Sequence, residues 1–171
     1  MIIQVQGKYK GIDLEQEEAQ SRPEYRTLRK TKGTYVLLVS VGRNTPVKVG
    51  ALGKIEFRKG TYAYVGSAQN GIEKRVARHL RREKRKFWHI DYLLAQEAVR
   101  IEKVLYKRAP RQEECRTAQT LSKPGNPVRG FGSSGCSCSS HLFKIEERSL
   151  FEIMEGWGSD PLTNFRKPSG E

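Results

Sequence analysis

Side chains that could act on a phosphate ester gather in one stretch of the chain, residues 60–86. This stretch carries the hydroxyls of Tyr62 and Tyr64, then a Gly66-Ser67 turn that another backbone can approach closely, and then a run rich in arginine. Guanidinium groups bind phosphate oxygens through a planar fork of N–H donors. The stretch therefore suits binding of a phosphodiester, and we take it as one half of a candidate site.

The arginine-rich run is predicted to be a helix from Ile72 towards Lys86, with Asn70 as its N-cap. The predicted apolar arc consists of Ile72, Val76, Ala77 and Leu80, and the flank beside it of Arg75, Arg78, His79 and Arg82. Residues 72–86 contain eight Lys or Arg and two Glu. Because unneutralised like charges destabilise a helix, this density favours a bound polyanion over a purely solvated face.

A second candidate group lies on a later predicted helix, residues 111–121. At helical spacing, Glu114 falls on the apolar arc with Ala118 and Leu121, whereas Glu113 points away. A carboxylate aimed at a core is costly unless a cation or a metal ion meets it. We therefore expect Glu114 to belong to a site and Glu113 to be its solvated neighbour.

The overall composition indicates the class of partner. The 171 residues contain 32 Lys and Arg and 19 Asp and Glu, a formal net charge of +13. Such an excess favours nucleic acid, because neutralised phosphates release their counterions on binding. The three cysteines are too few for a secreted disulfide framework, and no signal peptide or apolar run of about 20 residues is evident. We expect a cytoplasmic protein without membrane contact.

The elements that must position these groups predict an α+β fold with a small central antiparallel β-sheet flanked by helices. Residues 33–41 are nearly all apolar, which predicts a central strand covered on both faces, with Tyr35, Leu37 and Val39 on one of them. Further strands are predicted at 47–49, 54–57, 61–65, 99–108 and 142–145, and a short helix from Asp91 to about Ala98. The strands at 47–49 and 54–57 form an extra hairpin.

Composition divides the chain into three parts. Residues 1–31 carry mixed charge with little apolar periodicity and are predicted to be an N-terminal extension. Residues 32–147 form the predicted domain, and residues 148–171 are expected to be a C-terminal tail. Four apolar side chains of the tail are expected to dock on the domain: Phe151, Ile153, Met154 and Trp157.

The order of these features resembles the GIY-YIG nuclease superfamily. That name comes from two tripeptides on neighbouring strands, to which GTY at 33–35 and YVG at 64–66 are similar. Thr34 and Val65 replace isoleucines, but both are β-branched and suit a strand. The extra hairpin, the E-C-x-x-A run from Glu114 and the segment GFGSSGCSCSSHLF resemble the Uri branch of archaea and some bacteria.

The resemblance implies a metal-dependent endonuclease that hydrolyses a DNA phosphodiester bond. Glu114 would be the only protein carboxylate on one Mg²⁺ or Mn²⁺ ion. Arg75 would hold a phosphate oxygen and offset charge in the transition state. Tyr35 would act as general base or position the water, and Tyr64 would line the site. The base role requires nearby cations to lower a tyrosine pKa of about 10. His79 would relay the proton or contact phosphate.

Contacts with the nucleic acid are expected from a further set of residues: Gly66, Ser67, Lys74, Arg78, Arg82 and Arg85. Gly66 would allow a nucleic-acid strand to approach the backbone. DNA is the expected partner, with RNA left open, and no organic cofactor is expected.

Cys136, Cys138 and His141, with Cys115 upstream, offer a possible Cys₃His zinc set. Their compact spacing departs from the usual zinc-knuckle patterns, and free cysteines commonly serve as small buried residues. We therefore favour free cysteines over zinc at this cluster.

Two alternatives to a nuclease stay open. One is a non-catalytic DNA- or RNA-binding protein on the same fold, and the other is a ribosome-associated protein in which Tyr35 and Tyr64 are structural. Arg75 and Glu114 would then form ordinary ion pairs. The presence of all four residues together favours the nuclease, since a pure binder has no need of a lone inward carboxylate.

Overall fold

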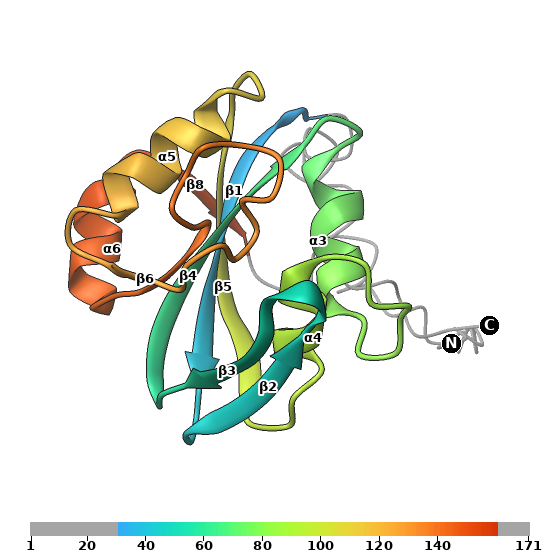
Figure 1. Cartoon of the computed structure of the whole chain (residues 1–171). Helices are drawn as coiled ribbons and strands as arrows, with labels where there is room; N and C mark the ends of the chain where they lie inside the picture. Colours follow the sequence, from blue (N-terminus) through green and yellow to red (C-terminus); the bar gives the residue numbers. More distant parts are fainter. Residues whose placement is uncertain (1–30, 161–171) are drawn as a thin grey trace, which may run out of the picture.

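A computed structural model of the chain describes residues 31–160 as an α+β unit (Figure 1). Its strands are β1 (Gly33–Val41), β2 (Thr45–Val49), β3 (Gly53–Phe57), β4 (Gly60–Ala68), β5 (Val99–Arg108), β6 (Asn126–Pro127), β7 (Leu142–Lys144) and β8 (Gly158–Asp160). Its helices are α3 (Ile72–Leu80), α4 (His89–Leu94), α5 (Glu113–Leu121) and α6 (Glu147–Ile153). The main sheet has the order β6-β7-β4-β1-β5-β8, and β2 and β3 form a separate hairpin. The predicted fold class and the extra hairpin are confirmed.

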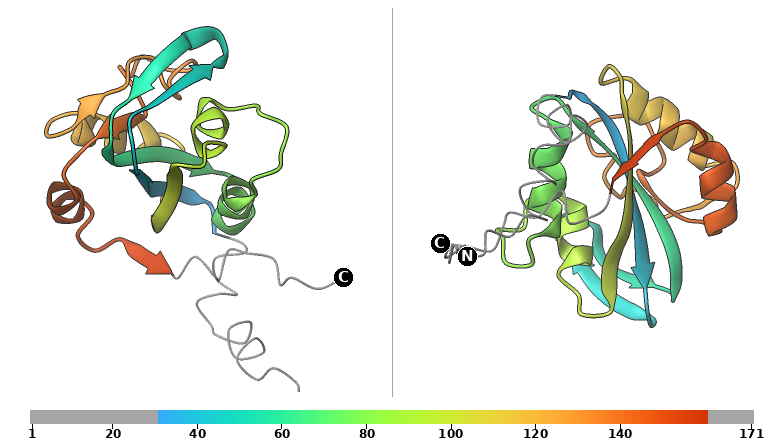
Figure 2. Two further views of the ribbon diagram at one scale, coloured as in Figure 1. Left: turned by 90° about the horizontal axis from the view of Figure 1, so that it is seen from below. Right: turned by 180° about the vertical axis from the view of Figure 1, so that it is seen from behind.

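The strand β1 is central and pairs antiparallel with β4 on one side and β5 on the other. Tyr35, Leu37 and Val39 face one core, shared with the hairpin, α3 and α4. Val36 and Leu38 face a second core, shared with α5 and α6. The two further views in Figure 2 show these helix pairs on opposite faces of the sheet. The predicted central strand, buried on both faces, is therefore confirmed.

The arginine-rich helix is shorter than predicted, because α3 ends at Leu80 and residues 81–88 continue without helix. Lys84 folds back there and donates hydrogen bonds to the carbonyl oxygens of His79 and Arg81. In a longer helix, backbone N–H groups of the next turn would donate to these carbonyl oxygens. The N-cap is Gly71, not Asn70. Its φ of 103° is open to glycine and strained for other residues.

The next helix begins two residues earlier than predicted. Asp91 lies inside the first turn of α4, which ends at Leu94 rather than near Ala98. Its carboxylate accepts hydrogen bonds from the backbone N–H groups of Phe87 and Trp88, both at 2.9 Å. Asp91 therefore satisfies amides that precede the helix and fixes the end of the basic loop 81–88.

Residues 148–160 belong to the folded body and do not form a separate tail. Most of α6 lies in this segment and packs on the second core, and β8 pairs with β5 at the edge of the sheet. The expected docking of Phe151, Ile153, Met154 and Trp157 is confirmed. The predicted extension, apart from Thr31, and residues 161–171 lie outside the described residues.

The helices of residues 31–160 are all too short or too polar to cross a lipid bilayer.

Candidate functional site

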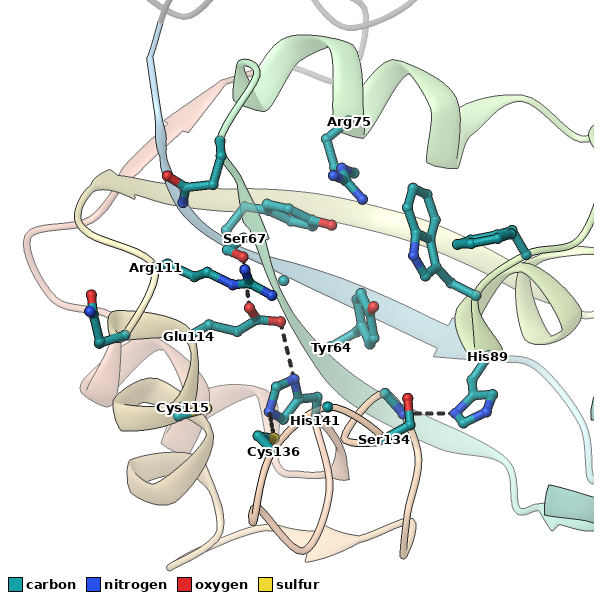
Figure 3. Close-up of a pocket in the computed structure, with 18 of the residues that line it drawn as sticks. Tyr64, Ser67, Arg75, His89, Arg111, Glu114, Cys115, Ser134, Cys136 and His141 are labelled. Carbon is teal, nitrogen blue, oxygen red and sulfur yellow. Dashed lines mark hydrogen bonds and ion pairs between the residues drawn. The ribbon is translucent and has the colours of Figure 1, made fainter. Parts of the chain in front are cut away.

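A cleft of about 870 Å³ lies beside the last residues of β4 (Figure 3). Along β4, the short strand β7 pairs only with Tyr62–Tyr64. The end of β4 extends beyond this pairing, and its residues Gly66 and Ser67 line the cleft. The lining residues are Tyr35, Tyr64, Gly66, Ser67, Gln69, Asn70, Arg75, Phe87, Trp88, His89, Arg111, Gln112, Glu114, Cys115, Gly132, Ser134, Gly135, Cys136 and His141.

Both faces of β4 contribute to this cleft. Tyr64 lies on the face that packs with α3, and Ser67, three residues on, lies on the opposite face and reaches α5. Figure 3 shows Arg75 entering from α3 and Glu114 from α5. The structure thus brings Tyr35, Tyr64, Arg75 and Glu114 to one cleft, although they come from four different elements.

Glu114 is the carboxylate of the cleft, with its side chain 20% exposed. Its Oε2 accepts a hydrogen bond from Ser67 Oγ at 2.7 Å, and its Oε1 lies 3.2 Å from Nδ1 of His141. Burial raises the pKa of Glu114, but the hydrogen bonds with His141 and Ser67 outweigh burial and hold the pKa below its ordinary value. The carboxylate is therefore ionised at neutral pH and fixed in position.

Glu113 is not the solvated neighbour that the helical wheel predicted. Its Oε1 lies 2.6 Å from Nζ of Lys107 on β5, and its side chain is 17% exposed, close to the value for Glu114. The wheel describes one helix and contains no information on the strand beside it. The two acids therefore differ in partner, a strand lysine for Glu113 and the cleft for Glu114.

Tyr35 and His79 form a buried pair, each 2% exposed, with Oη 2.7 Å from Nε2. Burial lowers the pKa of His79 to about 3, so the ring is neutral. Within residues 31–160 its Nδ1 has no hydrogen-bond partner. Since an unpaired buried N–H is rarer and costlier than an unpaired lone pair, we expect the proton on Nε2, donated to Tyr35. The Tyr35 hydroxyl then keeps its own proton for the cleft.

Both tyrosines of the cleft are held in their protonated form. Burial, reinforced by Tyr64, raises the pKa of Tyr35 well above its ordinary value, and Arg75 offsets only part of the rise. Burial, reinforced by Glu114, likewise raises the pKa of Tyr64. A general base needs the opposite shift. The protein environment therefore opposes the base role predicted for Tyr35, whereas positioning of a water molecule requires only its hydroxyl.

Two arginines of α3 contact one indole ring but differ in their other partners. The Cζ atoms of Arg75 and Arg78 lie 4.3 and 4.1 Å from the centroid of the Trp88 ring. Arg78 also donates to both oxygens of Asp91, at 2.8 and 2.9 Å. Arg78, predicted to contact nucleic acid, forms an internal ion pair with Asp91, whereas Arg75 points into the cleft.

The other predicted nucleic-acid contacts have varied positions. A Cβ added to Gly66 would lie 2.3 Å from Oη of Tyr35, its partner across the β1–β4 ladder. Glycine is therefore needed there to make room for Tyr35, and Gly66 also lines the cleft. Ser67 holds Glu114. The remaining three are exposed and lie outside the cleft lining: Lys74, Arg82 and Arg85.

Two functional partners were missed from the sequence. His141 was considered only as a zinc ligand, and its contact with Glu114 joins residues 27 positions apart, for which the sequence carries no signal. Asp91 was predicted only to start a helix. An acid five residues after Lys86, the last cation of the basic run, was the available signal for the ion pair of Asp91 with Arg78.

Comparisons with known proteins give one family. A family model described as "Domain of unknown function DUF123" matches residues 34–157, which cover most of the folded body and every residue that lines the cleft. No curated protein and no solved structure matches the chain.

Proposed function

The chain belongs to the family of the domain of unknown function DUF123, and from its cleft we propose that the protein is a metal-dependent endonuclease that hydrolyses DNA phosphodiester bonds. The observation that carries this proposal is an ionised, fixed carboxylate, Glu114, and a guanidinium, Arg75, in one cleft beside two tyrosine hydroxyls. The same residues carry the resemblance to GIY-YIG nucleases.

One Mg²⁺ or Mn²⁺ ion fits the Glu114 side of the cleft. Each carboxylate oxygen has one hydrogen-bonding partner, Ser67 or His141, and keeps a lone pair for a metal ion. A single carboxylate, completed by water and phosphate oxygens, is a ligand set that such hard cations accept. When bound, the ion supplies charge stabilisation at the leaving oxygen. Ser67 and His141 would hold the carboxylate at that position.

Arg75 would bind a non-bridging oxygen of the scissile phosphate. Its guanidinium contacts the Trp88 ring at 4.3 Å, which limits its motion and leaves the N–H groups directed to the cleft. A fixed guanidinium fork both orients the phosphate and offsets the charge that builds in the transition state.

Tyr35 would orient the attacking water rather than remove its proton. With its proton on Nε2, the tautomer expected above, His79 would donate to the Tyr35 oxygen and direct the hydroxyl proton towards the cleft. Tyr64 packs edge-on against the His79 ring, with centroids 6.1 Å apart, and supports this pair. In this assignment His79 positions Tyr35 and does not relay a proton, because its pKa is too low for it to act as a base.

The DNA strand would be bound by exposed cations beside the cleft, Lys74, Arg82 and Arg85. Phe87 lies near the end of the basic loop 81–88 and lines the cleft, and it is the only large apolar side chain exposed among the described residues, at 75%. An exposed aromatic ring beside cations suits stacking on an unpaired base.

The experiment that tests the proposal is cleavage of supercoiled plasmid and of single-stranded DNA by the purified protein in Mg²⁺, Mn²⁺ or EDTA. We expect cutting with either metal, none in EDTA, and a loss of about 10²–10³-fold in Arg75→Ala. Cutting that persists in EDTA, or at the wild-type rate in Arg75→Ala, would indicate a contaminating nuclease. Salt-sensitive DNA binding without cutting in any metal would favour the non-catalytic binding protein.

Replacing Tyr35 with Phe is expected to slow cutting about 10²-fold, because the water would lose the group that orients it. Tyr62→Phe is the matched control, since its hydroxyl donates to the carbonyl oxygen of Arg58 at 2.8 Å outside the cleft. By chemical denaturation, Tyr62→Phe is expected to cost about 1 kcal/mol, and Tyr35→Phe about 1–3 kcal/mol because it also leaves the buried ring of His79 without its partner. Equal cutting rates in the two variants would contradict a role for the Tyr35 hydroxyl in the cleft.

A further inference from the structure

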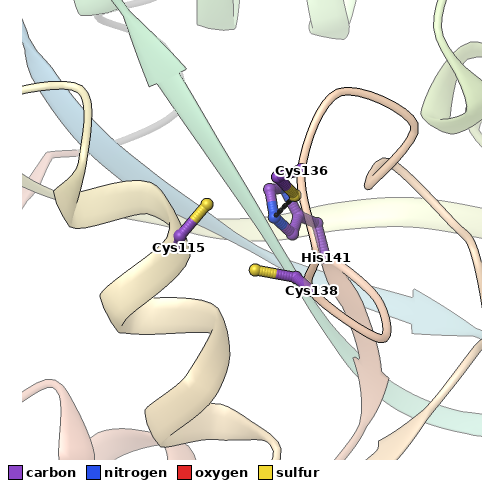
Figure 4. Close-up of side chains that lie close together, drawn as sticks. All are labelled: Cys115, Cys136, Cys138 and His141. Atoms are coloured by element: carbon purple, nitrogen blue, oxygen red, sulfur yellow. Dashed lines mark hydrogen bonds between the residues drawn. The ribbon is translucent and has the colours of Figure 1, made fainter.

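We propose that Cys115, Cys136, Cys138 and His141 bind one zinc ion. Their ligand atoms all lie within 4.8 Å of one another (Figure 4). With Zn–S near 2.3 Å and Zn–N near 2.0 Å, tetrahedral geometry places ligand atoms about 3.5–3.8 Å apart. Sγ of Cys136 and Nε2 of His141 are already 3.4 Å apart. Small movements of the side chains would therefore complete a zinc tetrahedron.

The four ligands come from two parts of the chain that the fold brings together. Cys115 lies in α5, and the other three lie within six residues of the loop that leads into β7. The loop is closed on itself by backbone hydrogen bonds from Gly130 to Ser139 at 2.8 Å and from His141 to Phe131 at 2.7 Å. The thiols of Cys136 and Cys138 lie within 4.8 Å of the Cys115 thiol on α5 (Figure 4), so a metal ion here would fasten the loop to the helix.

His141 is oriented for this role by a carboxylate. Its Nε2 faces Sγ of Cys136, and its Nδ1 faces Oε1 of Glu114 at 3.2 Å. Histidines that bind zinc almost always donate their other N–H to a carboxylate, a carbonyl or water, which fixes the tautomer and the ring orientation. The structure therefore supplies the four zinc ligands and also Glu114, the carboxylate that would hold the other ring nitrogen of His141.

The four sulfur and nitrogen ligands favour a different metal ion from the one proposed at the Glu114 carboxylate. Thiolate and imidazole ligands select zinc, whereas magnesium and manganese prefer oxygen ligands. Four protein ligands fill a tetrahedron and leave no open position, as in structural zinc sites. The three cysteines are free thiols in the structure and would release their protons on binding. The ion would be structural, and it would hold the loop that carries Gly132, Ser134 and Gly135 into the cleft lining.

Elemental analysis of the full chain, produced without a histidine tag and purified under reducing conditions in the presence of zinc, tests this site. We expect about one zinc ion per chain after dialysis. Cys136→Ser and Cys138→Ser are expected to weaken zinc binding by more than about tenfold, because each removes a ligand. Ser137→Ala, an exposed residue between them, is the control and is expected to keep the ion. Cobalt(II) added to the metal-free wild-type chain should give thiolate charge-transfer bands and tetrahedral visible bands.

Three results would overturn the site: wild-type protein without stoichiometric zinc, equal zinc content in Cys136→Ser and wild type, or cobalt spectra without thiolate bands. A disulfide among these cysteines in protein kept reduced would also exclude it. If a serine variant does not fold, zinc release from the wild-type chain by a thiol-modifying reagent gives the same answer. The measurements follow metal content and not DNA cutting, so the zinc site and the nuclease can fail independently.

Discussion

Glu114→Gln is expected to reduce metal-dependent DNA cutting by about 10³-fold, since the lost metal site supplies several kcal/mol of transition-state stabilisation. The substitution keeps the shape of the side chain and an oxygen that can accept from Ser67, but it removes the charge that attracts a divalent cation. DNA binding in EDTA should be unchanged or tighter, because a negative charge has left the cleft. Initial cutting rates in Mg²⁺ and Mn²⁺, with binding measured separately, separate these two effects.

The adjacent acid provides a matched control for this prediction. Glu113→Gln alters the same helix one residue earlier, at 17% exposure compared with 20% for Glu114, and its partner is Lys107 on β5. We expect Glu113→Gln to retain cutting and to lose only the modest stability of a partly exposed ion pair. Similar losses of cutting in both variants would mean that the cleft carboxylate has no special role.

The largest expected effect on stability comes from Asp91, whose side chain is fully buried. It accepts two hydrogen bonds from Arg78 and one each from the amides of Phe87 and Trp88. Asp91→Ala would leave a half-buried guanidinium and two amides without their acceptor, at a cost of about 3–5 kcal/mol. Chemical denaturation measures this loss, which is a large part of the total stability of an ordinary domain.

The same carboxylate predicts a dependence on acid. Burial raises the pKa of Asp91, but the hydrogen bonds from Arg78 and the two amides outweigh burial and bring the pKa below its ordinary value. A lowered native pKa contributes stability above the unfolded pKa of about 3.9, and this contribution is lost as pH falls through the native value. The difference in stability between wild type and Asp91→Asn should therefore be present at pH 7 and shrink below about pH 4.

A surface acid gives the contrast for Asp91. Glu97 lies 4.0 Å from Arg43, and both side chains are largely exposed. Glu97→Ala is expected to leave the free energy of unfolding nearly unchanged, because solvent screens such pairs. A loss in Asp91→Ala no greater than in Glu97→Ala would contradict the structural role of the buried carboxylate.

The sequence predicted those parts of the fold that depend on local pattern. Alternating and continuous apolar residues located β1, the hairpin, β4 and β5, because strand periodicity and burial on both faces are visible in the residues themselves. The end of α3 depends on Lys84 folding back onto backbone carbonyls, and β8 has three residues that form a strand only against β5. Neither contact has a local signature, which is why the sequence pattern predicts a longer helix and a C-terminal tail at residues 148–160.

The candidate site shows the same division. Helical spacing singled out Glu114, but Ser67 and His141, which hold it, are 47 and 27 positions away. Helical spacing also predicts Arg75 and Arg78 on the same flank of α3. In the structure, Asp91 pairs with Arg78, and Arg75 is the one that lines the cleft. A base role for Tyr35 requires nearby cations to lower its pKa, but burial dominates and raises the pKa instead. Burial depends on the packed core and cannot be read from neighbouring residues.

The two sides of the cleft occur one after the other along the chain, which has a consequence during translation. Arg75 and the basic loop 81–88 are synthesised well before Glu114 and the loop that ends at His141. A nascent or truncated chain that stops near residue 110 contains the cationic side of the cleft but lacks the carboxylate side. Such a chain lacks the carboxylate proposed to hold the metal ion, so the proposed chemistry would become available only when synthesis of the domain is nearly complete.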